Sequence, residues 1–227
     1  NASPYILAYS VSSSGWGSAV SAPSTTPAGP YGYGFAWSKT NTFIMYGCST
    51  SPYTQTYVWT GSGFGSKHSD PSSTAGSSVQ TVAINHNGTE VAAGSDSSPV
   101  VNAWAFSGGM GSKRSNPGTL PGAFSNGLDW NNDGTEVVFG TDDSPRVYAY
   151  AYTAGSGFGS KRSDPGTLPS NTGNWVKFSS DGTDIFIGTQ GTRFCFVYPY
   201  SNGWGTKYSN PSSALQGGIY NGTITAY

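Results

Sequence analysis

Gly157–Pro165 reads GFGSKRSDP, and four variants of this nonapeptide, which we call the cassette, recur along the chain. The other copies occupy residues 15–23, 63–71, 109–117 and 203–211. Their closing prolines are separated by 46 or 48 residues. A repeat of this length that runs from end to end indicates a repeat architecture, and it leaves no boundary at which to divide the chain into domains.

The composition indicates an all-β protein. The 227 residues include 33 glycines and 14 prolines, and aromatic residues make up 15%, a mixture that disfavours helices and favours strands. The net charge is −1 and only ten residues are basic, so we expect no nucleic-acid partner. The sequence has no apolar run of about 18 residues, so we also expect no membrane insertion.

One repeat shows how its strands follow one another. Val79–Ile84, Glu90–Gly94 and Pro99–Phe106 are three short extended runs, and Asn87-Gly88 joins the first two. An Asn-Gly pair is typical of a tight hairpin turn between antiparallel strands. The cassette that follows supplies a fourth strand, so each repeat predicts a four-stranded antiparallel sheet.

The third strand of each repeat has one face of large side chains and one of small side chains. The large face carries Tyr9, Tyr57, Trp104, Tyr150 and Tyr198. The opposite face carries Ala8, Thr56, Ala103, Ala149 and Val197. A sheet with this asymmetry packs face to face against a copy of itself. Such sheets arranged around an axis form a β-propeller, so the sequence predicts one five-bladed β-propeller domain over residues 1–227.

The two ends of the chain each hold part of one repeat. We expect four blades at about 30–71, 76–117, 122–165 and 170–211. After the last cassette, residues 216–227 supply only two strands, whereas residues 3–23 supply a third strand and a cassette. We therefore predict that both termini share the fifth blade and close the ring by strand pairing.

Phe178–Thr189 resembles the first hairpin of WD-repeat propellers, although the terminal Trp-Asp pair is absent. Together with the cassette and the Gly-Thr-Leu-Pro run that follows two of its copies, the chain resembles a group of WD-like propeller proteins from bacteriophage genomes and metagenomes. The resemblance covers the whole chain. It implies a virion or extracellular location and offers no catalytic residue to carry over.

The acidic residues do not indicate catalysis, because most recur by position at turns and strand starts. A glycoside hydrolase needs two carboxylates flanking one bond. Asp129 and Asp143 alone break the repeat pattern. Asp129 matches the position of Lys177 in the next blade, which favours an interblade ion pair, and we expect Asp143 to be a solvated turn residue. We predict that the protein is not an enzyme.

Neither the cysteines nor the histidines indicate a metal or a cofactor. Cys48 and Cys195 fall at different places in repeats that are not neighbours in a ring of five, so a disulfide between them is geometrically difficult. They also lack the spacing of a metal site, and His68 and His86 are the only histidines. We expect two free thiols and no cofactor or metal.

Polar residues recur at the start of the innermost strand. The set is Tyr33, Gln80, Asn126 and Asn174, with Trp175 next to the last. Amides beside an aromatic face suit sugar hydroxyls, so these residues predict glycan binding at several equivalent shallow sites. The alternative is that the amides hydrogen-bond one another around the axial channel.

A basic column runs along the outer strand of the repeats. It consists of Lys67, Lys113, Arg114, Lys161, Arg162 and Lys207. Solvated lysines that discourage sheet-to-sheet aggregation explain the column, and recognition of an anionic glycan or partner is the alternative.

We therefore predict a non-enzymatic, virion-associated or surface-exposed propeller that acts in structural attachment or in recognition of a host-surface glycan. Its expected partners are a surface glycan or other virion proteins. The alternatives are a secreted multivalent lectin and, more distantly, a glycoside hydrolase.

Overall fold

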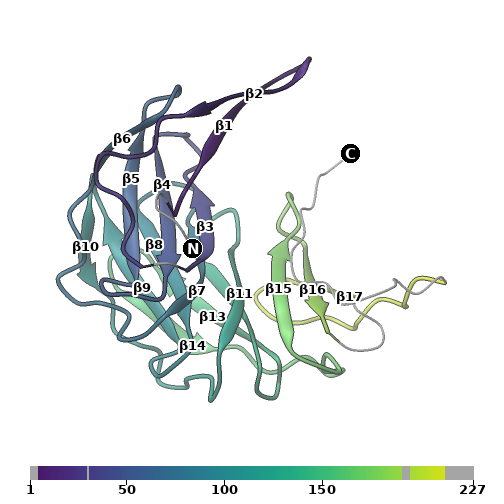
Figure 1. Cartoon of the computed structure of the whole chain (residues 1–227). Coiled ribbons are helices and arrows are strands. Elements are labelled where there is room, and N and C mark those ends of the chain that lie inside the picture. Colours follow the sequence, from purple (N-terminus) through teal and green to yellow (C-terminus); the bar gives the residue numbers. More distant parts are fainter. Residues whose placement is uncertain (1–4, 30, 191–194, 213–227) are drawn as a thin grey trace.

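The structure is a computed structural model, and it describes residues 5–29, 31–190 and 195–212. Within these ranges the chain forms seventeen β-strands and no helix (Figure 1). Accordingly, the described part contains no helix that is long and apolar enough to cross a membrane. The all-β prediction is confirmed.

Four sheets follow one another in chain order, each with its first strand innermost. The strands of the first two are β3 (Gly32–Trp37), β4 (Phe43–Cys48), β5 (Thr54–Trp59), β6 (Phe64–Lys67), β7 (Val79–Ile84), β8 (Glu90–Ser95), β9 (Val101–Phe106) and β10 (Met110–Lys113). Those of the next two are β11 (Ser125–Trp130), β12 (Glu136–Thr141), β13 (Val147–Thr153), β14 (Gly157–Lys161), β15 (Gly173–Phe178), β16 (Asp184–Thr189) and β17 (Cys195–Pro199). All neighbouring strands are antiparallel, and the inner strands β3, β7, β11 and β15 contact one another in that order.

The fifth sheet is a hairpin of β1 (Ala8–Ser12) and β2 (Gly15–Val20). It contains the third strand and the cassette expected for the shared blade, and Figure 1 shows it beside blade 1, the sheet β3–β6. The predicted contribution of residues 216–227 lies outside the described residues and stays a prediction. In blade 4, the sheet that begins with β15, Gly205 and Tyr208 donate backbone hydrogen bonds to β17, so the cassette follows that edge without forming a regular strand.

The hydrophobic core lies between the blades. One cluster joins blades 2 and 3, another joins blades 1 and 2, and a third joins blades 3 and 4. In blades 1 to 4 the expected large-residue face is buried, since Tyr57, Trp104, Tyr150 and Tyr198 have no exposed surface. The corresponding residue of β1, Tyr9, is 48% exposed, so the prediction is wrong for that residue. Face-to-face packing of sheets with a bulky and a small face is therefore confirmed for blades 1 to 4.

The buried rings of this face also carry polar atoms that find partners. Trp104 Nε1 donates to the carbonyl of Ser73 at 2.7 Å, and Tyr150 Oη donates to that of Thr119 at 2.9 Å. Tyr198 Oη makes the equivalent bond to Thr167 at 2.7 Å. Each acceptor lies just after the cassette of the preceding repeat, so these bonds hold the connecting loop onto the blade that it precedes.

Candidate functional site

The candidate binding residues occupy β-bulges at the start of the inner strands. In blade 2, Val79 pairs with Ser95 and Thr81 pairs with Gly94, so Gln80 is an extra residue opposite the ladder. The same one-residue shift leaves Tyr33, Asn126 and Asn174 as the extra residues of β3, β11 and β15. A bulge changes the direction of a side chain relative to the sheet, and here it does so at the same register in four blades.

These four residues line a single pocket at one mouth of the ring axis. The pocket, which we call the axial pocket, has a volume of about 480 Å³ and is lined by Tyr33, Gln80, Asn126, Asp142, Thr172, Asn174 and Gln190. The sequence predicted several equivalent shallow sites, whereas the structure brings the four predicted residues to one pocket; the number of binding sites stays a prediction. Inner strands converge on the axis, so residues at one register become neighbours and line one pocket with four different side chains.

The amide side chains of the axial pocket do not all hydrogen-bond to one another. Asn126 Nδ2 donates to the carboxylate of Asp142 at 2.7 Å. Asn174 is buried, with 7% of its surface exposed. Gln80 is half-buried, and its side chain makes no hydrogen bond within the described ranges. At least this amide and the half-exposed phenol of Tyr33 are open to a ligand.

Trp175 lies one step deeper along the axis. It lines a narrower cavity of about 230 Å³ behind the axial pocket, together with the four bulge residues. Its indole Nε1 is buried and has no hydrogen-bond partner in the described part of the chain. Trp175 therefore lies next to the four bulge residues and lines the smaller cavity, but it does not line the axial pocket.

Close packing of the inner strands explains the small residues next to the bulges. A Cβ on Gly34 would lie 2.9 Å from Thr81 Cα, and one on Gly127 would lie 2.8 Å from Val176 N. Real side chains do not approach a backbone so closely, so glycine is required for β3 to contact β7 and for β11 to contact β15. This contact brings the bulge residues of neighbouring blades to one pocket.

The basic column is engaged inside the protein. Lys67 forms an ion pair with Asp70 at 2.5 Å, Lys161 pairs with Asp164, and Lys207 Nζ donates to Asn210 at 2.7 Å. Lys113 Nζ donates to the carbonyl of Thr74 at 3.2 Å. The side chains of Lys67 and Lys161 are only 15% and 16% exposed, which corrects the expectation of solvated lysines.

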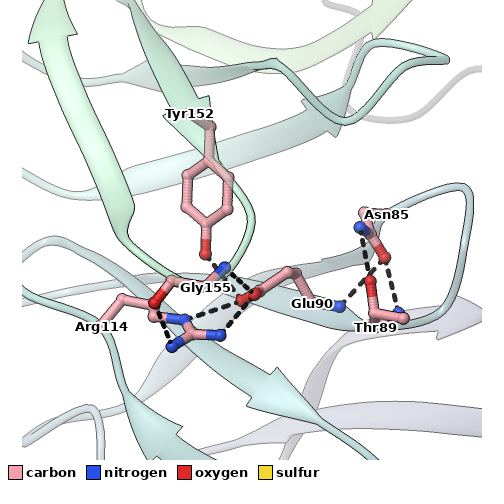
Figure 2. Close-up of polar contacts among 6 residues, drawn as sticks. All are labelled: Asn85, Thr89, Glu90, Arg114, Tyr152 and Gly155. Carbon is pink, nitrogen blue, oxygen red and sulfur yellow. Dashed lines mark hydrogen bonds and ion pairs between the residues drawn. The ribbon is translucent and has the colours of Figure 1, made fainter.

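Each of the two arginines of the column forms an ion pair with a glutamate of its own blade, and a tyrosine of the next blade donates to the same glutamate. Figure 2 shows the set around Arg114. Arg114 Nε and Nη2 donate to Glu90, which is 2% exposed and also accepts from Tyr152 Oη of the next blade at 2.8 Å. Gly155 N donates to the same carboxylate at 2.9 Å. These hydrogen bonds raise the pKa of Arg114 above its ordinary value. We therefore place the candidate site at the axial pocket and not at the basic column.

Glu136, Arg162 and Tyr200 repeat this arrangement between blades 3 and 4. The prediction that turn chemistry explains both glutamates is wrong, because each carboxylate is bound by an arginine and a tyrosine. The matching signal is present in the sequence: wherever the repeat has Glu at the strand start, its own cassette has Arg and the next blade has Tyr.

The two aspartates that break the repeat pattern have structural partners. Asp129 accepts from Lys177 Nζ at 3.0 Å and from Phe178 N at 2.9 Å, which confirms the interblade ion pair. Burial raises the pKa of the Asp129 carboxyl, although Lys177 acts in the opposite direction. Asp143 accepts from Tyr148 Oη at 2.7 Å and from Gly122 N at 2.8 Å, so the expectation of a solvated turn residue was wrong.

Both cysteines are free thiols, as expected, and Cys48 is fully buried. Among the described residues, no cluster of three or more His, Cys, Asp or Glu side chains is placed to hold a metal ion. The residues that sequence reasoning missed at the site are Asp142, Thr172 and Gln190. Asp142 lies in a column with Asp96 and was explained by its turn, so only the three-dimensional structure shows that it lines the axial pocket.

No protein-family model and no curated protein matches this chain. Among solved structures, it is similar to the β-propeller domain of Cps50 (Swd1) from Myceliophteria thermophila, with a TM-score of 0.59 and 9% identity over 83% of this chain and 56% of that one. It is also similar to Kuenenia stuttgartiensis hydrazine synthase, with a TM-score of 0.56 and 10% identity over 77% of this chain and 47% of that one. The chain thus spans about half the length of these structures, and the similarity shows the fold alone: the protein is a β-propeller.

Proposed function

We propose that the protein is a non-enzymatic recognition propeller that binds a glycan in the axial pocket. The observation that carries the proposal is that four β-bulges direct Tyr33, Gln80, Asn126 and Asn174 to one pocket. Bulges that all occur at one register and line a cavity indicate a site rather than a packing defect. The volume of about 480 Å³ is in the range of small-molecule sites, roughly 300–1,000 Å³.

The chemistry of the pocket suits sugar hydroxyls. Amide and phenol groups both donate and accept hydrogen bonds, and planar amides fix the orientation of a diol. Trp175 adds an aromatic surface on the adjoining cavity. A hydrolase is less favoured, because glycosidic cleavage needs a pair of carboxylates and Asp142 is the single carboxylate that lines the axial pocket in the described part of the chain.

The setting that we propose is a virion or an extracellular surface, where the propeller would contact a host glycan. Its basis is the likeness of the cassette and its flanking runs to propellers of bacteriophage and metagenomic origin. Co-purification of the protein with phage particles would support this setting, whereas a protein found only free in the medium would favour a secreted lectin.

The binding site is tested by replacing single bulge residues. After a broad glycan-binding screen, titration calorimetry with the best oligosaccharide should show that Gln80→Ala and Asn126→Ala each weaken binding about two- to tenfold, the effect of one lost neutral hydrogen bond. Asn116→Ala, which removes an exposed amide outside the pocket, is the control and should bind as the wild type does. Equal affinity in all four proteins would refute the axial pocket as the site.

The number of sites distinguishes the axial pocket from the multivalent binding that the repeat predicts. One pocket per chain should give a stoichiometry of one, and a monovalent oligosaccharide should compete fully with a multivalent surface. A stoichiometry of four or five would instead favour separate sites on the blades.

A further inference from the structure

Of the described side chains that line the axial pocket, one is charged, namely Asp142. The other lining groups are a phenol, a hydroxyl and four amides, all of them uncharged. Asp142 follows β12, and its backbone N donates to the carbonyl of Phe124 at 3.0 Å. This bond fixes the residue beside the bulge of β11, so the carboxylate belongs to the same wall as Asn126.

The Asp142 carboxylate is held in place through one of its two oxygens. Asn126 Nδ2 donates to Oδ1 at 2.7 Å, which commits the amide donor of the bulge residue to orienting the carboxylate. Oδ2 makes no hydrogen bond within the ranges that the structure describes. A ligand that enters the pocket therefore meets a positioned acceptor with a negative charge.

Among the residues that the structure describes, no basic side chain lines the pocket to offset this charge. Arg146, the nearest candidate in sequence, donates from Nη1 to the backbone carbonyl of Asp142 and not to its carboxylate. The guanidinium thus supports the turn from outside the lining.

We infer that the axial pocket selects its ligand by charge: it accepts sugars that carry an amino group or are neutral, and it rejects uronic and other acidic sugars. The inference rests on the proposed function and names the class of glycan for that site. An ammonium group donates to Oδ2 and gains a charge-assisted hydrogen bond, whereas a carboxylate in the same place meets a like charge without a donor to compensate it.

The test compares three oligosaccharides of equal length by titration calorimetry: a glucosamine oligomer, an N-acetylglucosamine oligomer and a glucuronate-containing oligomer. The pH is chosen so that the amines are protonated and the carboxylates ionised. We expect the wild type to bind the amino oligomer at least about tenfold more tightly than the acidic one, with the neutral one between them. Asp142→Asn should reduce the ratio to near one.

Asp96→Asn is the matched control, because Asp96 occupies the same column in blade 2 and does not line the axial pocket. It should keep the wild-type preference. A second measurement on the wild type avoids any question of misfolding in Asp142→Asn: raising the salt concentration should narrow the difference between the amino and acidic oligomers, since salt screens an accessible carboxylate.

Each outcome decides between the two proposals. Similar affinity of the wild type for all three oligomers would overturn the charge rule and leave glycan recognition standing. A preference that persists in Asp142→Asn would also overturn the rule, because another group would then carry it. Failure of the wild type to bind any of the three, or any glycan in a broad screen, would overturn the proposed function itself.

Discussion

Gly127 shows how one residue without a side chain sets the distance between two blades. Its Cα faces the backbone of Trp175 and Val176, and an added Cβ would lie 2.8 Å from Val176 N. We predict that Gly127→Ala destabilises the protein by about 1–3 kcal/mol, because β15 must move away from β11. Urea unfolding measures this change.

The control for this substitution is Gly166→Ala. Gly166 follows a cassette, and a Cβ built there would meet no atom within 4 Å. Its replacement should change the stability by no more than about 0.5 kcal/mol. Equal effects of the two substitutions would mean that the close approach of β11 and β15 does not limit packing.

The two thiols provide a second test at this scale. Burial raises the pKa of both Cys48 and Cys195, and a raised thiol pKa leaves less of the reactive thiolate at neutral pH. We expect slow reaction with a disulfide reagent in the native protein and rapid reaction of both thiols after unfolding. Fast stoichiometric labelling of the native protein would show that Cys48 is accessible, contrary to its complete burial.

At the residue scale, the sequence is enough to predict which strand position carries the candidate binding residues, but not how those residues are arranged in space. Tyr33, Gln80, Asn126 and Asn174 stand out because they recur at one register. That each is the extra residue of a bulge depends on which residues pair across strands, and the pairing is not visible in a period of 46 or 48 residues. For the same reason the convergence of the four on one pocket was missed.

At the scale of elements, the three described interfaces among blades 1 to 4 each have a matched set of three side chains. Between blades 2 and 3 the set is Glu90, Arg114 and Tyr152, whereas between blades 1 and 2 the equivalent positions hold Phe43, His68 and Phe106. The Phe43 and Phe106 rings stack with centroids 4.0 Å apart. The same interface geometry is thus stabilised in one place by charge and in another by aromatic packing.

We predict that Arg114→Met destabilises the protein by about 3–5 kcal/mol, because Glu90 would remain buried without its cation. Thermal or urea unfolding provides the measurement. Lys67→Ala is the comparison: its ion pair with Asp70 involves a carboxylate that is 42% exposed, and removal should cost about 1 kcal/mol or less.

A triple replacement tests whether the set acts as a unit. Glu90→Phe, Arg114→His and Tyr152→Phe together copy the aromatic interface of blades 1 and 2, and we expect the triple variant to be more stable than Arg114→Met alone. The opposite order would show that the surrounding residues, and not the three side chains, decide which chemistry an interface accepts.

The sequence shows that each position of these sets recurs from repeat to repeat, but it does not show which recurring positions contact one another. Arg114 lies 24 residues from Glu90 in the same blade, and Tyr152 of the next blade lies 62 residues from it. A local turn signal at Glu90 therefore indicates neither partner, and only the packing of one blade on the next adds the tyrosine to the pair.

At the scale of the whole molecule, the propeller follows from the repeat and from the alternation of large and small side chains, and both are local properties of the sequence. We predict that closure of the ring depends on the two ends. The described part shows the N-terminal share: β1 and β2 pair, and Ile6 is buried against Ile44 and Tyr57 of blade 1. Phe35 and Trp37 on β3 are 44% and 42% exposed.

We predict that deletion of residues 1–11 lowers the thermal stability far more than Lys67→Ala does, because it removes β1 and the buried Ile6. Deletion of residues 216–227 should have a similar effect if these residues complete the same blade. Differential scanning calorimetry of the three variants tests both statements. An unchanged melting temperature after the C-terminal deletion would contradict closure of the ring by the two termini.

Because of the bulges, the residues that form the strand ladders are not the residues whose side chains line the axial pocket. The extra residue of a bulge takes no place in the paired ladder, whose hydrogen bonds run through its neighbours on either side. Tyr33, Gln80, Asn126 and Asn174 already differ in size and polarity, although they stand at equivalent points of one scaffold. Such a molecule is open to diversification: a new side chain at any of the four points alters the shape and chemistry presented at the axis while the strands beneath it keep their register.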